Sequence, residues 1–379
     1  MKLLILTNSF SFSSAGMSGG DRMTFDLFAE NDRYLKVWIG SKSALENVRN
    51  SKQNNSLIIT PLLFERFPLV LNYVFRTLYS LVRVISIKDI EYIYSSSDFF
   101  PDVVVARFYR IIHKRVKWIQ CSYHIQIEEK NFSSYIKMKL QRLMLIISKN
   151  CDAFICINSA VKLHLHNNLK FTKNIYLLTP GVKFSKEEIL AVNSQKIADL
   201  PINIKENFFL SIGRISASKN SEQLIELWSK VIQLDKSLKL VVIGSGNSKE
   251  VLKFQSMIVS NKLDNNIYFL NYVDEIIKIF LLSRSYALIN ISKSEGYSIA
   301  IAEALKYNLQ VLAWDLDVYR EHFKGAIHAI PLFDLDCFVS EIIKIVNFPE
   351  SKRTGNHAIN IKSISDMRDD FDQIIKSLA

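Results

Sequence analysis

Residues 286–314 read YALINISKSEGYSIAIAEALKYNLQVLAW. The segment opens with an apolar run typical of a buried strand, and a turn with Glu295 and Gly296 follows. From near Ser298 the apolar residues recur at helical spacing, and a second apolar run ends the segment. A helix between two almost continuously hydrophobic strands indicates a parallel sheet that helices cover on both faces. The segment therefore predicts one strand–helix–strand unit of an α/β domain.

The same alternation of short apolar runs and longer helical patterns extends along the whole chain. In the first half we expect strands at residues 2–7, 35–39, 57–60, 91–94, 118–122, 153–157 and 175–178. After a polar stretch around residues 192–206 we expect further strands at 208–212, 238–243, 267–270, 287–291, 311–314 and 326–330. The prediction is an α/β chain of two Rossmann-like domains with parallel sheets. Ligands of such sheets bind outside the carboxyl ends of the strands.

Length and composition exclude several other classes of protein. A chain of 379 residues fits two domains better than one. With 49% hydrophobic and 22% charged residues it can build large cores, which excludes a disordered protein. Four cysteines without C-x-x-C spacing indicate a reducing, cytoplasmic location. The most apolar stretch, residues 67–87, is not predicted to span a membrane because it contains Arg76 and Arg83.

The positive charge lies in the first half of the chain. The net charge is +11, and residues 1–180 contain 24 basic and 13 acidic side chains, so the second half is neutral. The basic residues concentrate in segments 66–83, 107–117 and 137–149, for each of which we expect a basic amphipathic helix or an ordinary solvated one. Basic amphipathic helices suit an anionic membrane surface or phosphorylated ligands. Nucleic acid is not expected, because no helix-turn-helix, RNP or zinc-ligand spacing accompanies the charge.

Two cations meet after the strand at 208–212. Arg214 follows this strand directly, and Lys219 stands at the start of the next helix. A lysine at the positive end of a helix dipole is locally unfavourable, so we expect an anion such as a phosphate to bind between it and Arg214. The alternative is two unrelated surface cations near a turn.

Two carboxylates stand eight residues apart in the segment quoted first. Glu295 precedes the helix and Glu303 lies in its second turn, so both can face a ligand at the strand ends and accept hydrogen bonds from sugar hydroxyls. The N–H groups of Tyr297, Ser298 and Ile299 can meet a phosphate or sugar oxygen at the helix start. The alternative is a solvated helix charge for Glu303 and a capping role for Glu295.

Other short motifs carry less weight. Gly19 and Gly20 lie in a predicted loop after the first strand, but their spacing is not the G-x-G-x-x-G of a dinucleotide site. Two D-x-D triplets, 315–317 and 334–336, could hold a metal ion but lack the surrounding pattern that such a site needs. We therefore expect no metal site.

These motifs together resemble the family-four retaining glycosyltransferases of the GT-B fold. The block from Glu295 to Glu303 resembles the E-x7-E signature of that family. Further motifs follow in the family's order: its glycine loop at Gly19–Gly20, its N-G-V-D turn at Thr179–Val182, its phosphate site at Gly213–Arg214 with Lys219, and its G-x-G-x turn at Val241–Asn247. The family often has glycine where this chain has Ser298, and its N-G-V-D turn differs at Pro180 and Lys183, so donor preference does not carry over.

The resemblance implies a retaining, metal-independent hexosyl transfer from a UDP- or GDP-sugar to a carbohydrate or lipid-linked acceptor, without a cofactor. His124 follows the strand at 118–122, where the family often has a histidine near the reacting sugar; a structural histidine is the alternative. The implied catalytic residues are His124, Glu295, Arg214 and Lys219. The implied donor-binding residues are Gly19, Gly20, Arg214, Lys219, Gly244, Glu295, Gly296, Tyr297, Ser298, Ile299 and Glu303.

The resemblance also implies a function for each domain. Residues 1–183 would bind the acceptor, residues 184–358 the nucleotide sugar, and a final helix in 359–379 would cross back to the first domain, with a hinge near 182–205. The basic first domain suggests peripheral docking on the inner face of the plasma membrane, in assembly of a surface polysaccharide or glycolipid. A sugar-nucleotide epimerase of similar fold and a non-catalytic sugar-binding partner remain alternative functions.

Overall fold

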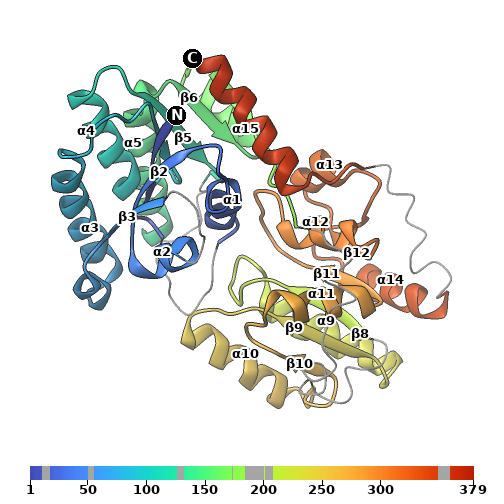
Figure 1. The fold of residues 1–379 in the computed structure, drawn as a ribbon. Helices are drawn as coiled ribbons and strands as arrows, with labels where there is room; N and C mark the ends of the chain where they lie inside the picture. The colour runs from blue at the N-terminus through green and yellow to red at the C-terminus, as the bar shows by residue number, and fades with distance from the viewer. Residues whose placement is uncertain are drawn as a thin grey trace. The chain divides into compact units, whose positions relative to one another are not determined.

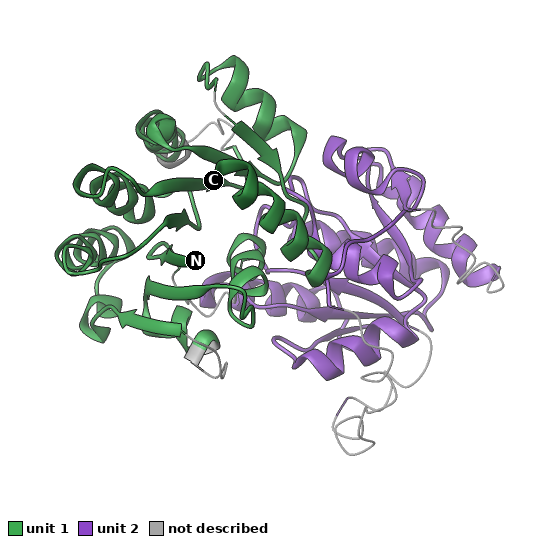
Figure 2. Cartoon of the chain, turned by 45° about the horizontal axis from the view of Figure 1, so that its top comes forward, with its two compact units in different colours: residues 1–12, 17–181, 364–379 green, residues 13–16, 182–363 purple. Residues whose placement is uncertain are grey.

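The computed structural model describes residues 1–10, 18–49, 55–125, 132–172, 174–183, 200, 208–348 and 359–379. These residues form two compact units (Figure 2). Unit 1 contains the described residues up to Gly181 together with Ile364–Ala379, and unit 2 contains those between Val182 and Ser363. Most of the hinge predicted near 182–205 lies outside the described residues.

The described part of unit 1 is built on a seven-stranded parallel sheet with the order β3-β2-β1-β4-β5-β6-β7 (Figure 1). Its strands are β1 (Lys2–Thr7), β2 (Leu35–Gly40), β3 (Asn55–Ile59), β4 (Tyr92–Ser95), β5 (Lys117–Ser122), β6 (Ala153–Cys156) and β7 (Asn174–Leu177). Its helices are α1 (Gly19–Phe28), α2 (Lys42–Arg49), α3 (Leu69–Val84), α4 (Phe100–Ile112), α5 (Phe132–Ile147), α6 (Ser159–Asn167) and α15 (Ile364–Leu378), with 3-10 turns η1 (Leu62–Arg66) and η2 (Ser148–Asn150). Strands β1, β4 and β5 are buried almost throughout, which explains the nearly continuous hydrophobic sequence of β1.

Helix α15 completes unit 1 although it comes from the end of the chain. The ring of Phe371 lies 5.0 Å from that of Phe28 on α1 and 5.9 Å from that of Tyr94 on β4. The guanidinium of Arg368 donates hydrogen bonds of 2.9 and 2.7 Å to the carbonyl oxygen of Asp26. Aromatic packing and hydrogen bonds to the main chain thus hold this helix against α1.

The described part of unit 2 contains a six-stranded parallel sheet with the order β10-β9-β8-β11-β12-β13. Its strands are β8 (Phe208–Ile212), β9 (Lys239–Ile243), β10 (Ile267–Phe269), β11 (Ala287–Asn290), β12 (Gln310–Trp314) and β13 (His328–Ile330). Its helices are α9 (Ser221–Leu234), α10 (Ser248–Ser260), α11 (Glu275–Arg284), α12 (Ile299–Lys306), α13 (Asp317–Phe323) and α14 (Leu335–Asn347). A hydrophobic core of this unit includes the fully buried indoles of Trp228 and Trp314.

Each strand predicted from the sequence is present, and the α/β fold class with two parallel sheets is confirmed. Two local predictions are wrong. The basic segment 107–117 is not one helix, because α4 ends at Ile112 and Lys117 already begins β5. Gly19 and Gly20 do not lie in a loop; they open helix α1, whose N-cap is Ser18. Among the described residues, no helix combines the length and hydropathy that crossing a bilayer requires.

Candidate functional site

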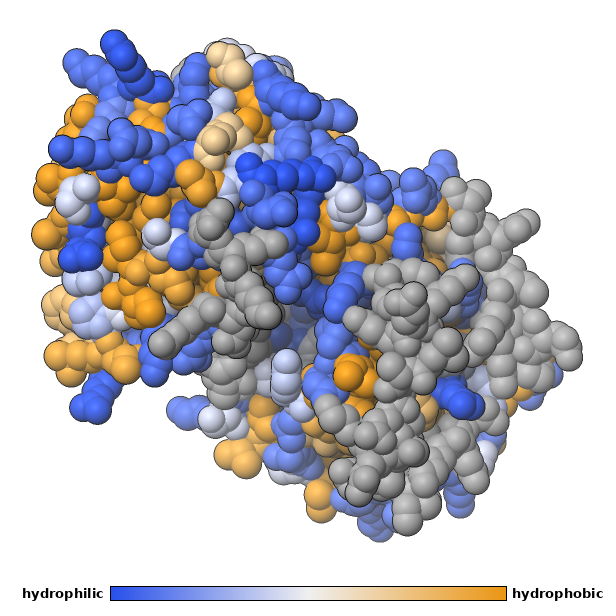
Figure 3. All heavy atoms as spheres, in the orientation of Figure 1, coloured by the Kyte–Doolittle hydropathy of each residue, from blue (hydrophilic) through white to orange (hydrophobic). Residues whose placement is uncertain are grey.

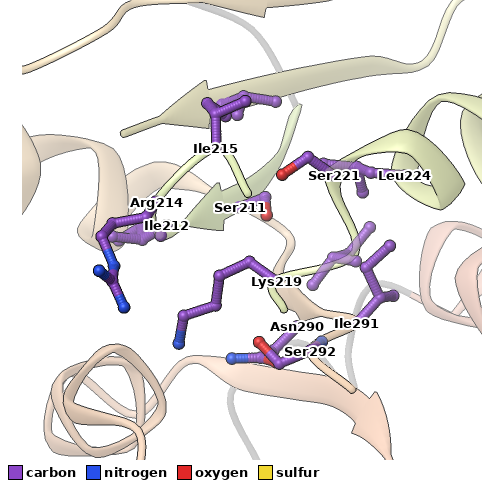
Figure 4. A pocket seen from close by; sticks show the side chains of 13 residues that line it. Ser211, Ile212, Arg214, Ile215, Lys219, Ser221, Leu224, Asn290, Ile291 and Ser292 are labelled. Atoms are coloured by element: carbon purple, nitrogen blue, oxygen red, sulfur yellow. The ribbon is translucent and has the colours of Figure 1, made fainter. Parts of the chain in front are cut away.

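The sheet of unit 2 reverses its strand order between β8 and β11. β9 and β10 follow on one side of β8, and β12 and β13 follow on the other side of β11. Connections leave such a point in opposite directions, so the carboxyl ends of the two strands form an open crevice for ligands. A pocket lies here, and its lining includes Ser211, Gly213, Arg214, Lys219, Asn290 and Ser292 (Figure 4).

Both predicted phosphate-binding cations line this pocket. The backbone around Arg214 is fixed by hydrogen bonds from Gly213 N to Ile243 O (3.0 Å) and from Ile215 N to Ser245 O (2.9 Å), which continue the pairing of β8 with β9. Arg214 itself is exposed and Lys219 is partly exposed. Their nitrogen ends lie on the same side of the pocket (Figure 4). The arrangement offers two positive charges to one anion.

Lys219, which lines the pocket, is paired with Glu295. The Lys219 ammonium donates to Glu295 Oε1, and Ser292 Oγ donates to the same oxygen over 2.8 Å. A main-chain hydrogen bond of 3.0 Å from Lys293 N to Ser218 O holds the two loops side by side. The predicted phosphate-binding lysine and the predicted sugar-binding carboxylate therefore form one site. Ser292 was missed at the sequence level because no motif contains it.

Ser298 lies at the start of α12 in a backbone conformation that favours glycine. Its φ is 86° and its ψ 87°, where a Cβ is strained. Its Oγ accepts a hydrogen bond of 3.2 Å from Asn290 Nδ2, and Tyr319 Oη donates to Asn290 Oδ1 over 3.1 Å. This buried chain of hydrogen bonds holds the turn that leads to Ile299, the first residue of α12.

The neighbouring Tyr297 has a structural side chain. It is 4% exposed, and its ring packs 4.9 Å from that of His322 and 5.1 Å from that of Phe323. Burial raises the pKa of its phenol, so the hydroxyl stays protonated. The predicted contribution of Tyr297 to a ligand is thus limited to its main chain, as it is for Gly296 before it.

Glu303 lies deeper than Glu295 and has a partner that sequence reasoning missed. It is 3% exposed on α12, and its Oε1 is 2.7 Å from Nζ of Lys278 on α11. A solvated helix charge, the alternative considered above, does not describe this buried carboxylate. In the sequence this partner is only a lysine three residues after Glu275, on a helix that contains no recognised motif.

Gly244 is required by the close approach of two strand ends. A Cβ at this position would lie 1.7 Å from the carbonyl oxygen of Gly213. Its N–H donates to the carbonyl oxygen of Asn271 over 2.8 Å. The glycine therefore lets the loop after β9 pass against the residue that precedes Arg214.

The remaining predicted residues, Gly19, Gly20 and His124, belong to unit 1. A Cβ on Gly20 would meet the Tyr123 ring at 2.5 Å, which explains a glycine at this position of α1. His124 follows β5, is partly exposed, and its carbonyl oxygen accepts a hydrogen bond of 2.7 Å from Gln141 Nε2. The same amide donates to Asp98 over 2.8 Å, and burial raises the pKa of that carboxyl. Gly20 thus packs against the ring of the residue that precedes His124.

The acidic triplets have structural partners. Asp315 and Asp317 both accept hydrogen bonds from Arg320. Asp334 accepts from the main chain of Cys337 in α14, and Asp336 pairs with Lys230. Within the described ranges, no group of three His, Cys, Asp or Glu residues is placed to hold a metal ion.

Comparison of sequences connects the chain with glycosyltransferases. The sequence model described as "Glycosyl transferases group 1" matches residues 192–354. The O-antigen chain mannosyltransferase RfbU of Salmonella typhimurium is 27% identical over 209 residues, which are 52% of this chain and 57% of that protein. An uncharacterised glycosyltransferase of Methanocaldococcus jannaschii is 28% identical over 44% of this chain and 40% of its own. The chain thus spans about half the length of these relatives.

Comparison of structures covers the whole chain. HepE of Anabaena, solved with UDP and glucose, superposes with a TM-score of 0.73 at 15% identity, covering 100% of both chains. An α,α-trehalose-phosphate synthase (UDP-forming) of Burkholderia xenovorans superposes with a TM-score of 0.77 at 9% identity, again over both complete chains. At such identities the likeness shows the fold alone. Residues 192–354 are therefore recognised as a group 1 glycosyltransferase domain, and the chain that carries them has the two-domain fold of the GT-B glycosyltransferases.

Proposed function

We propose that the protein is a retaining glycosyltransferase that moves a sugar from a UDP-sugar to a saccharide acceptor in the assembly of a surface polysaccharide. One observation carries the proposal: Arg214 and Lys219 line the pocket between the ends of β8 and β11 in a group 1 glycosyltransferase domain, and the Lys219 ammonium pairs with Glu295. Two cations beside a carboxylate match a diphosphate joined to a polyhydroxylated sugar. The mannosyltransferase that acts on O-antigen chains supports a polysaccharide product.

The geometry supports catalysis by stabilisation of the leaving group. Departure of the nucleotide puts negative charge on its diphosphate, and Arg214 and Lys219, which line the same pocket, would stabilise that charge. Because these two side chains supply positive charge, we propose that the transfer proceeds without a metal ion. Glu295 would accept hydrogen bonds from the donor sugar, and His124 would orient hydroxyls or stabilise charge at the reacting carbon. Glu303 would accept from the ribose hydroxyls.

Ligand-dependent stability tests the donor. We expect UDP and one UDP-sugar to raise the melting temperature of the purified protein, since a ligand that binds only the folded state stabilises it. GDP, ADP and CMP should give smaller shifts, and the Glu303→Gln variant should lose the UDP shift while remaining folded. A GDP shift larger than the UDP shift would contradict the proposed base.

Product analysis tests the reaction. With UDP-sugar and a saccharide acceptor, NMR at the anomeric carbon should show retained configuration, and EDTA should leave the rate unchanged. Isomerised donor without acceptor would favour the epimerase instead. Binding without turnover, in folded protein with every acceptor supplied, would favour the non-catalytic partner.

The acceptor would be presented at a membrane, because unit 1 exposes an unusually apolar face. Figure 3 shows hydrophobic residues gathered over the α3 side of this unit. We define the α3 ridge as the exposed large hydrophobic residues of η1, α3 and their flanks: Leu62, Leu63, Phe67, Leu69, Val70, Leu71, Val74, Leu78, Val82 and Ile85. Arg66 and Arg83 are exposed among them. An apolar face with interspersed cations fits an anionic bilayer surface.

The ridge makes a prediction about vesicle binding. Val70 and Val82 are 69% and 68% exposed, so replacing both with glutamate should leave the fold intact. We expect the double variant to bind vesicles of phosphatidylglycerol and phosphatidylcholine at least tenfold more weakly in sedimentation, because it loses apolar contact and gains repulsion. The matched control replaces Leu234 and Leu252 of unit 2, which are 67% and 65% exposed. Equal binding by both double variants would refute docking through the ridge.

A further inference from the structure

Lys278 is a buried lysine that none of the recognised motifs contains. It lies on α11 and is 8% exposed. Lysine is almost never this buried unless its charge is paired. Its ammonium lies 2.7 Å from Glu303 Oε1 and 2.8 Å from Glu275 Oε1. The Glu275 side chain is 41% exposed, so the buried partner is Glu303.

The pair links the candidate site to an element outside it. Glu303 sits on α12, the helix that begins at the pocket, whereas α11 begins after β10. Asp274 caps α11 by accepting a hydrogen bond of 3.0 Å from Ile277 N, which fixes the start of the helix next to Lys278. A carboxylate with 3% exposure has little freedom to turn once one of its oxygens is bound by an ammonium. The ion pair with Lys278 therefore restrains the direction in which the Glu303 carboxylate faces.

We propose that Lys278 is a positioning residue for nucleoside recognition: it holds the Glu303 carboxylate in the orientation that accepts hydrogen bonds from the ribose hydroxyls of the donor. This inference rests on the proposed function, because it takes the ligand to be a nucleoside diphosphate. A lysine that only ties α11 to α12 would support the stability of unit 2 but would not distinguish a ribose from a deoxyribose. The two roles therefore differ in a measurable way.

The test compares ligands that differ by one hydroxyl. Dissociation constants for UDP and 2′-deoxy-UDP would be measured by calorimetry for the full chain and for Lys278→Met. We expect the unaltered protein to prefer UDP by about tenfold, the size expected of one hydrogen bond to a charged group. Lys278→Met should weaken the binding of UDP by about tenfold and the binding of 2′-deoxy-UDP by less than about twofold, so that the preference for UDP disappears. Glu303→Gln should remove the preference as well.

Controls separate positioning from folding. Glu275→Gln removes the more exposed partner of Lys278 and should keep the preference for UDP. Lys278→Arg keeps the charge but changes its geometry, and we expect an intermediate preference. If Lys278→Met does not fold, Lys278→Gln replaces it under the same criterion.

Two results would overturn the inference in different ways. Equal weakening of both ligands by the variant at position 278 would show a merely structural lysine while leaving the proposed function intact. Failure of the unaltered, folded protein to bind UDP would overturn the proposed donor and with it this inference.

Discussion

Replacing Arg214 with alanine is expected to lower the rate of glycosyl transfer about 10²- to 10³-fold, and replacing Lys219 should have an effect of the same size. Each side chain supplies one of the two positive charges in the pocket where the diphosphate would leave. Because that charge develops during the reaction, the loss should appear mainly in kcat and less in KM. Steady-state kinetics with UDP-sugar and acceptor measures both quantities.

The controls for these variants lie on the same unit. Lys230 forms an exposed ion pair with Asp336 away from the pocket, and Lys230→Ala should change neither kcat nor stability appreciably. Lys219→Ala also leaves Glu295 without its ammonium partner, so its melting temperature must be compared with that of Arg214→Ala. A loss of less than about tenfold for Arg214→Ala, in folded protein, would contradict electrostatic stabilisation by this residue.

The fold could be predicted from the sequence because the strands are buried on both faces. In β9 and β11 the sequences KLVVI and ALIN leave little room for polar residues, so short hydrophobic runs marked both strands. The prediction of one helix over residues 107–117 was wrong because the alternation of cations and large apolar residues continues across the end of α4. His113 has φ −122° and ψ 78°, which ends the helix before Lys117 enters β5. Composition alone does not mark that boundary.

The residues of the candidate site could be predicted from the sequence mainly where they directly follow strands. Arg214 and Glu295 follow β8 and β11, and the strand order brings these two ends together. Lys278 is different, because it reaches Glu303 from a helix whose packing depends on the tertiary structure. Ser292 is different again, since a serine after a strand has many uses and only its hydrogen bond to Glu295 singles it out. The partners of Glu295 and Glu303 can therefore be identified only from the three-dimensional structure.

The requirement for glycine at position 244 leads to the second large effect. Gly244→Ala is expected to lower the free energy of unfolding by about 3 kcal/mol or more, because overpacking against backbone leaves no flexible side chain to move aside. The new Cβ would lie 1.7 Å from the Gly213 carbonyl oxygen, so the ends of β8 and β9 must separate. Arg214 follows directly, and its displacement should abolish the stabilisation of the protein by UDP. Urea unfolding and thermal shift measure the two effects.

A glycine in the same loop pair supplies the matched control. A Cβ on Gly213 would have the Lys219 Cδ, at 3.9 Å, as its nearest neighbour, which is an ordinary van der Waals contact. Gly213→Ala should therefore change the free energy of unfolding by less than about 1 kcal/mol. If both alanine variants unfolded at the same urea concentration as the unaltered protein, the close approach of these strand ends would not be a constraint on the fold. A stability loss at position 244 alone would show that glycine is required there by the close approach to the Gly213 carbonyl oxygen together with the positive φ of 158°, and that this requirement fixes the main chain next to Arg214.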